Sequence, residues 1–222
     1  MITTRLICLT GDYITDTDHP DLNTYKKLLA KLPAAAPTYA STGNHDGGRW
    51  GEAKNRYPSS ELIRGMLSEA GIVVPHNAYA DAEIAGERVQ IVGIGDHWAR
   101  EQNARQAFKE LPRNADRLRI TLSHNPDTKE ILQYFSWELM LSGHTHGGQV
   151  VVPGFGPLIL PVNDRRYYKG LHTWQGRRLY ITRGVGGVAG AVRFACRPEV
   201  TILDLVPGES PVELTESRPR RA

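Results

Sequence analysis

The 222-residue chain has few cysteines, no long apolar run and little net charge. Its two cysteines, Cys8 and Cys196, predict neither a disulfide framework nor a zinc-ligand spacing, so a reducing cytoplasm is the expected location. No stretch approaches the ~20 apolar residues of a membrane span, and residues 1–5 do not begin a signal peptide. Peripheral membrane association stays open. A net charge of +3 gives no reason to expect specific nucleic-acid binding.

Glycine, by contrast, is abundant, with 22 residues in the chain. Average proteins contain about 7% glycine, and here many of the glycines cluster where apolar runs end. Several stand beside His, Asp or Asn. Loops at strand ends are where α/β proteins assemble their sites, because a rigid sheet fixes the side chains there. These clusters therefore direct attention to the ends of the expected strands.

Alternating helical and strand patterns predict a single α/β domain over residues 1–206, followed by a polar tail at 207–222. Short apolar runs predict strands at residues 5–10, 38–41, 118–123 and 139–142. Helical spacing predicts helices at residues 21–32, 60–70, 103–111 and 126–135. A hairpin is expected from 78–84 and 88–94. Residues 149–205 are expected to be mostly β, with a second hairpin turning at Gln175-Gly176.

Four of the expected strands end in potential metal ligands. The motifs, in chain order, are Gly11-Asp12, the GNHD at 43–46, Ser123-His124 and the GHTHG at 143–147. A lone Gly-Asp or a lone histidine signifies little, but four such motifs in succession favour a metal site. The candidate ligands are Asp12, Asn44, His124, His144 and His146. Oxygen and imidazole ligands without thiolate suit Zn, Mn, Fe or Ni in a catalytic site.

This series of motifs resembles the calcineurin-like metallophosphoesterase superfamily. The strings LSGHTHGGQV at 141–150 and SHNP at 123–126 are similar to a bacterial branch of it, which contains broad phosphodiesterases and some UDP-2,3-diacylglucosamine pyrophosphatases. The similarity extends from Leu6 to about Leu205. It implies a two-sheet β sandwich flanked by helices, in four αββα layers, with two metals at the sheet ends.

The resemblance also implies roles for individual residues. Asp12 would bridge the two metals, and Asn44, His124 and His144 would complete one metal site. His146 would belong to the other. His45 would face the phosphate or the leaving group, with Asp46 orienting its ring, and a metal-bridging hydroxide would attack phosphorus in line.

In one respect the chain departs from the family's pattern. The family opens with a strand ending in Asp-x-His, whereas the eleven residues before Asp12 contain neither Asp nor His. We therefore expect the usual first strand and helix to be lacking, leaving one tight metal site and a second that is weak or rebuilt. Asp16, Asp18 and His19 are candidate replacements, although solvating the loop and capping the next helix is the plainer interpretation. An edge strand left unpaired at residues 5–10 predicts a homodimer through the N-terminal region.

Two further residues are candidates for substrate binding. His97 follows Asp96 at the end of an apolar strand, and Arg183 lies in a glycine-rich loop. For Arg183 and the similar Arg193, pairing with a carboxylate is the competing interpretation. We expect a metal-dependent phosphodiesterase acting on a small-molecule substrate. The alternatives are a phosphomonoesterase or protein phosphatase, a sugar-nucleotide pyrophosphatase, and a non-catalytic metal-binding relative.

Overall fold

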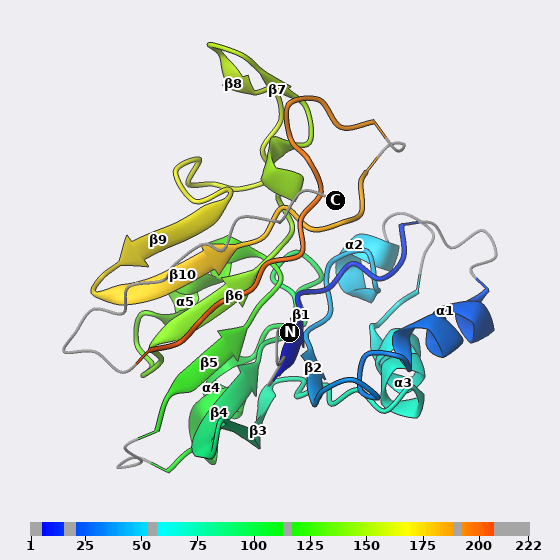
Figure 1. The fold of residues 1–222 in the computed structure, drawn as a ribbon, viewed down its shortest axis with the longest axis vertical. Coiled ribbons are helices and arrows are strands. Elements are labelled where there is room, and N and C mark those ends of the chain that lie inside the picture. The colour runs from blue at the N-terminus through cyan, green and yellow to red at the C-terminus, as the bar shows by residue number, and fades with distance from the viewer. Residues whose placement is uncertain (1–5, 16–20, 53–56, 113–116, 189–191, 207–222) are drawn as a thin grey trace.

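The computed structural model describes residues 6–15, 21–52, 57–112, 117–188 and 192–206. Its main element is a mixed six-stranded sheet in the order β3-β4-β5-β6-β10-β9 (Figure 1). The bounds of these strands are β3 Ala78–Ile84, β4 Glu87–Gly93, β5 Arg119–Leu122, β6 Leu139–Ser142, β9 Gly170–Trp174 and β10 Arg177–Ile181. β4, β5, β6 and β10 run parallel, so their carboxyl ends lie at one edge of the sheet.

Two smaller sheets complete the β structure. β1 (Ile7–Leu9) and β2 (Thr38–Ala40) pair in parallel, and β7 (Val151–Val152) forms a hairpin with β8 (Gly156–Pro157). The helices are α1 Leu22–Leu29, α2 Gly48–Glu52, α3 Glu61–Glu69, α4 Ala104–Lys109 and α5 Lys129–Leu132, with short 3-10 turns at Pro126–Thr128 and His146–Gly148.

Three buried clusters define four layers. Tyr39 of β2 packs with Ile91 and Leu122 of the six-stranded sheet, so the two sheets lie face to face. On the outer side of the small sheet, Ala40 packs against Ile63 and Leu67 of α3. A third cluster joins the far face of the large sheet to α4 and α5. The order is therefore helix, small sheet, large sheet, helix, and the expected αββα arrangement is confirmed. Figure 1 shows α1 and α3 on the outer side of the small sheet.

Most predicted elements are present, with ends set by local bonds. The predicted strands correspond to β1, β2, β5 and β6, and the predicted hairpin is β3-β4 with Ala78 opposite Gly93. Asp21 caps α1 by accepting a hydrogen bond from the Thr24 amide at 3.1 Å, and Asn103 caps α4 in the same way.

Two predictions of secondary structure are wrong. Residues 126–135 do not form one helix, because the Asn125 side chain accepts the Asp127 amide at 2.8 Å and starts a 3-10 turn. At the other end the Trp137 indole donates to the carbonyl of Leu132, where α5 stops. Residues 149–205 contain the expected hairpin at Gln175-Gly176, as β9 and β10, but are less regular beyond it, because the described part of 182–206 contains no strand. Its polar groups instead bond to loops beside the motif at 143–147.

Other expectations from composition can be compared with the structure. Both cysteines are free thiols, Cys8 half-buried and Cys196 buried. Among the described residues, no helix is both long enough and apolar enough to cross a bilayer. The tail at 207–222 lies outside the described residues.

Candidate metal centre

The loops after β1 and β2 approach each other closely at one end of the small sheet. A Cβ placed on Gly43 would lie 2.2 Å from Oδ1 of Asp12, so only glycine fits there. Asp12 itself has φ of 59°, in the left-handed region that non-glycine residues seldom adopt. Such backbone strain is typical of functional sites, where the surrounding structure imposes it. The contact places Asp12 at the meeting point of the two loops.

Three candidate ligands converge at this point. Asp12, His124 and His144 each offer one ligand atom, and these atoms all lie within 4.8 Å of one another. Nε2 of His124 is 3.0 Å from Oδ2 of Asp12 and 3.2 Å from Nδ1 of His144. His124 and His144 follow β5 and β6, whose neighbouring carboxyl ends bring them together. Strands distant in sequence therefore supply one cluster.

Backbone carbonyls hold the two imidazole rings in place. Nδ1 of His124 donates to the carbonyl of Thr10 at 2.5 Å, and Nε2 of His144 donates to the carbonyl of Pro161 at 2.9 Å. Each bond uses one ring nitrogen as a donor and leaves the other facing the cluster. Metal-bound histidines are usually oriented by this kind of outer hydrogen bond.

The charges of the cluster are coupled. Burial acts to raise the pKa of Asp12, but the charge and hydrogen bond of His124 lower it well below its ordinary value. Burial acts to lower the pKa of His124, yet Asp12 raises it to about 9. Burial lowers the pKa of His144 to about 3, so this ring is neutral at pH 7. A divalent cation between these atoms would replace the proton of His124 and release it.

Asn44 adds an oxygen without a partner. Its side chain is 1% exposed, and its Oδ1 has no hydrogen-bond partner among the described residues. Folded proteins rarely leave a buried polar atom unpaired, and a bound ion can satisfy such an atom. The next residue's amide, that of His45, donates to Oδ1 of Asp12 at 3.0 Å, so Asn44 lies beside the cluster. Two imidazoles, a carboxylate and an amide oxygen fit a divalent transition metal.

Asp46 stabilises the loop that carries Asp12. Its buried carboxylate accepts backbone N–H groups, and the donors are Gly43 at 2.7 Å, Tyr13 at 2.8 Å, Asp12 at 3.0 Å and Ile14 at 3.4 Å. Burial and the charge of Asp12 raise the pKa of Asp46 to about 7. These bonds make Asp46 a positioning residue for Asp12. Its orientation of the His45 ring stays a prediction.

His45 is half-buried at the edge of the cluster. Its backbone is fixed by the bond to Asp12, and its ring centre lies 6.4 Å from that of Trp50 in an edge-on arrangement. An imidazole held beside a metal cluster can donate a proton or a hydrogen bond to a substrate oxygen.

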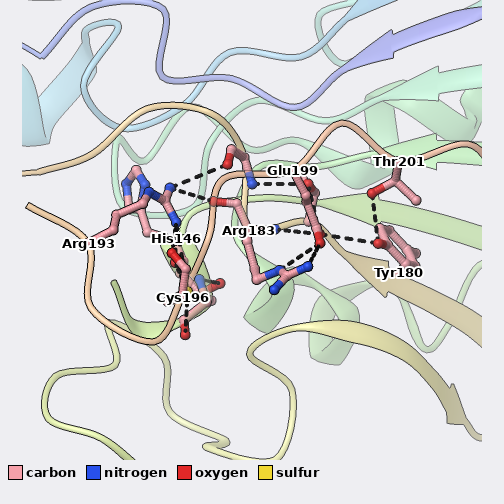
Figure 2. A network of polar contacts seen from close by, with 11 residues as sticks. His146, Tyr180, Arg183, Arg193, Cys196, Glu199 and Thr201 are labelled. Carbon is pink, nitrogen blue, oxygen red and sulfur yellow. Dashed lines mark hydrogen bonds and ion pairs between the residues drawn. The ribbon is translucent and has the colours of Figure 1, made fainter. Parts of the chain in front are cut away.

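His146 is held differently from the other two histidines. It has φ of 50° in the turn after Thr145, and its ligand atoms are not part of the 4.8 Å group. Burial lowers its pKa to about 4, with the charge of Asp12 acting in the opposite direction. Its backbone carbonyl accepts bonds from Arg193 at 3.1 Å and from the Cys196 thiol at 3.2 Å (Figure 2).

Figure 2 also shows the surroundings of Arg183. Nε of Arg183 donates to Oε2 of Glu199 at 2.6 Å, and its NH2 pairs with the same carboxylate. The guanidinium of Arg193 instead donates to backbone carbonyls, among them that of Arg183 at 2.8 Å. The carboxylate pairing considered for Arg183 is therefore present, while its binding of substrate stays a prediction.

His97 is half-buried, and its Nδ1 has no hydrogen-bond partner among the described residues. It lines a cavity beside the cluster together with Trp50 and Trp98, two residues that sequence reasoning missed. The ring centre of Trp98 lies 4.5 Å from that of His144. Neither tryptophan carries a motif, so no sequence signal placed it there.

Asp96 was also missed as a site residue, although a signal existed. It is fully buried, and its charge acts to raise the pKa of His124, which places it close to the cluster. Burial in turn raises the pKa of Asp96. The sequence Gly95-Asp96 after an apolar strand repeats the pattern of Gly11-Asp12, and the repetition was the signal.

The chain that carries these candidate ligands is a metallophosphoesterase. Residues 3–148 match the calcineurin-like phosphoesterase family, and the chain belongs to that family. It is a phosphoester hydrolase. It is 41% identical over 202 residues to "Phosphodiesterase YaeI" of Escherichia coli (strain K12), a match that covers 90% of this chain and 70% of that protein.

Two other relatives are informative. The chain is 32% identical over 206 residues to "Uncharacterized metallophosphoesterase YkuE" of Bacillus subtilis (strain 168), covering 90% of this chain and 67% of the relative. It is 27% identical over 242 residues to "UDP-2,3-diacylglucosamine pyrophosphatase LpxG" of Chlamydia muridarum, covering 89% of this chain and 73% of the relative. No solved structure matches the chain.

Proposed function

We propose that this protein hydrolyses phosphodiesters at the centre formed by Asp12, Asn44, His124 and His144, with His45 beside it. The observation that carries the proposal is the convergence of Asp12, His124 and His144 within 4.8 Å, next to the unpaired oxygen of Asn44. The 41% identity to a protein named a phosphodiesterase supports the diester as substrate class.

Each residue has a defined task in the proposed reaction. Divalent ions bound here would activate water and polarise a phosphoryl oxygen. Asp12, Asn44, His124 and His144 would hold an ion, and the carbonyls of Thr10 and Pro161 keep the two imidazole rings aligned. His45 donates a proton or a hydrogen bond to the departing ester oxygen.

The expected cofactor is Mn, Zn, Fe or Ni, with one tight position and a second that is weak or rebuilt. Asp12 and His146 are the candidate ligands of the second position. Asp16, Asp18 and His19, the possible replacements, lie outside the described residues. The donor set of oxygen and imidazole supports this group of metals but does not select one.

A sugar-nucleotide pyrophosphatase is the second candidate, supported by the identity to the relative named a UDP-2,3-diacylglucosamine pyrophosphatase. A phosphomonoesterase and a non-catalytic metal-binding relative are further alternatives. The test is hydrolysis of bis(p-nitrophenyl) phosphate and of p-nitrophenyl phosphate after chelation, then with Mn²⁺, Zn²⁺, Fe²⁺ or Ni²⁺ restored. We expect metal-dependent cleavage of the diester in preference to the monoester.

Preference for the monoester would overturn the substrate class, and no cleavage with any of the four metals would overturn the enzymatic assignment.

A homodimer through the N-terminal region is a further part of the proposal. Among the described residues, β1 pairs only with β2, and an edge strand of this kind can pair with another chain. Light scattering across micromolar concentrations tests it, and a monomer throughout that range would refute it. A cytoplasmic location likewise stays a prediction, based on the two free cysteines.

A further inference from the structure

A cavity of about 530 Å³ lies next to the metal cluster. It is lined by Trp50, His97, Trp98, Arg100 and Gln102. Small-molecule sites usually measure about 300–1,000 Å³ and combine aromatic walls with a few polar groups. Its volume falls within this range, and two indoles and three polar side chains line it, but it is an open pocket rather than an enclosed cavity.

The wall of the cavity continues directly into the cluster. The ring centres of Trp50 and Trp98 are 5.0 Å apart. Trp98 meets His144 edge-on at 4.5 Å, and Trp50 lies 6.4 Å from the ring of His45. One indole therefore contacts a candidate metal ligand and the other lies beside the candidate proton donor. A group bound against these indoles would therefore lie beside a phosphate held at the cluster.

The two tryptophans are fixed relative to each other. Trp50 belongs to α2, and Trp98 precedes Ala99, whose carbonyl accepts the Arg49 amide at 2.9 Å. A Cβ on Gly48 would lie 2.7 Å from the Cβ of Ala99, so the helix and the loop are in close contact. Oδ1 of Asp96 further accepts the Ala99 amide at 2.8 Å. A wall held in this way loses little conformational entropy when it binds a ligand.

We propose that this cavity binds a planar aromatic group on the alcohol side of one ester bond of the substrate, either an aryl ring bonded to the ester oxygen or a nucleobase linked to it through a sugar. The inference rests on the proposed phosphoesterase function and specifies the substrate class. Indole faces stack on flat π-systems of both kinds, and the exposed Arg100 adds a guanidinium that can stack on the same group. An unbranched alkyl group would gain none of these contacts.

The test compares three inhibitors of bis(p-nitrophenyl) phosphate hydrolysis by the metal-loaded enzyme. Phenylphosphonate and methylphosphonate share one anionic group and differ in the aromatic ring, and thymidine 5′-monophosphate carries a nucleobase. We expect phenylphosphonate or the nucleotide to bind about 5- to 100-fold more tightly than methylphosphonate, the scale of one stacking contact. Tighter binding of the nucleotide identifies a nucleobase site, and tighter binding of phenylphosphonate identifies an aryl site.

Substitutions test whether the preference for an aromatic inhibitor arises at this pocket. In Trp50→Leu, the inhibition constant of the aromatic inhibitor should rise towards that of methylphosphonate, so that the ratio of the two constants approaches one. The inhibition constant of methylphosphonate itself should be unchanged. Tyr134→Leu, which removes an exposed aromatic ring between α5 and β6 that does not line the pocket, should leave this ratio unchanged. A ratio near one in the parent, or an unchanged ratio in Trp50→Leu, would overturn the inference even if the enzyme cleaves diesters.

A binding measurement separates this inference from the proposed function. Trp137 and Trp174 are 2% and 8% exposed in the core, whereas Trp50 and Trp98 line the cavity. Phenylphosphonate or the nucleotide should quench the indole fluorescence of the parent protein. The quenching should be much smaller in the Trp50→Leu/Trp98→Phe double variant. If the protein cleaves no phosphoester, this titration still decides whether the cavity binds aromatic groups. Absence of quenching in the parent would count against the inference.

Discussion

His144 and His146 stand two residues apart in one loop, yet the structure supports them in different ways. The His144 ring is fixed by its own bond to the Pro161 carbonyl and faces the cluster. The His146 ring has no hydrogen bond to another described residue, and its backbone carbonyl is instead held by Arg193 and Cys196. A ring fixed through its own nitrogen is preorganised to bind a metal, whereas bonds to the backbone carbonyl of His146 do not orient its ring directly.

The chain segments that hold these residues differ in the same way. Asp12, His124 and His144 each follow a strand within two or three residues, so the sheets fix their positions. The support for His146 comes from residues 192–206, where the structure has no strand. We therefore expect the first metal position to be tight and the second to depend on a loop network.

Removing the fixed ring should have the largest effect. His144→Ala deletes one of three converging ligand atoms, so the protein should lose its tight metal and its activity should fall to background. Metal analysis of the dialysed variant, with circular dichroism to check the fold, measures this. Retention of a full equivalent of metal would show that His144 is not a ligand.

His45→Ala should lower kcat by roughly 10²–10⁴-fold, the scale of a general acid, while leaving the metal content unchanged. The reason is that His45 lies beside the cluster but its ring is not part of the 4.8 Å group. His172→Ala, on β9, is the matched control and should retain activity. Parental activity in His45→Ala would contradict the assigned role.

The two metal positions should differ in occupancy. Dialysed protein should contain nearer one ion than two per chain, and His146→Ala should keep that ion. The variant should require roughly 10- to 100-fold more metal for half-maximal activity, a range typical of disturbed metal surroundings. Activity titrated against Mn²⁺ measures the shift. Two tightly held ions would remove the contrast and direct attention to Asp16, Asp18 and His19.

The sequence predicted the surroundings of Asp12, His124 and His144 better than those of His146, which we call the loop side. Apolar runs ending in Gly-Asp, Gly-Asn-His-Asp and Gly-His-Thr-His located Asp12, Asn44 and His144. Strand order within each sheet and the packing of the two sheets bring these ends together. The predicted β structure at 149–205 was right for the hairpin of β9 and β10 but wrong beyond residue 181, where the described residues contain no strand. There the backbone is held by side-chain bonds such as those of Arg193, and these leave no periodic pattern in the sequence.

The aromatic wall was unpredictable for a related reason. Trp50 and Trp98 are separated by 47 intervening residues, and they meet only because a helix of five residues contacts the loop after β4. Asp46 shows that a motif can mark a residue as important without revealing what that residue does. Its motif indicated its importance, but its acceptance of four backbone amides depends on the close approach of two loops.

The smallest expected effect concerns the ion pair of Arg183 and Glu199, which supports the loop side. Burial acts to raise the pKa of Glu199, but the hydrogen bonds and charge of Arg183 lower it overall below its ordinary value of 4.5. The contribution of the pair to stability is therefore complete above about pH 4.5 and is lost as the pH falls through the folded-state pKa. Since the Arg183 side chain is 34% exposed, Glu199→Gln should cost only about 1 kcal/mol at pH 7.

Urea unfolding of the parent and of Glu199→Gln at pH 7 and at pH 3.5, both in chelator, measures that contribution. The difference between the two proteins should shrink at the lower pH, because protonated Glu199 resembles glutamine. Glu69→Gln, which breaks the exposed pair with Lys26, is the matched control and should change stability by less than about 0.5 kcal/mol at either pH. At saturating metal the Glu199 variant should keep the parent's kcat, because the pair supports His146 only through the loop. If the difference in unfolding free energy between the parent and Glu199→Gln were as large at pH 3.5 as at pH 7, Glu199 would support the loop through packing rather than through its charge.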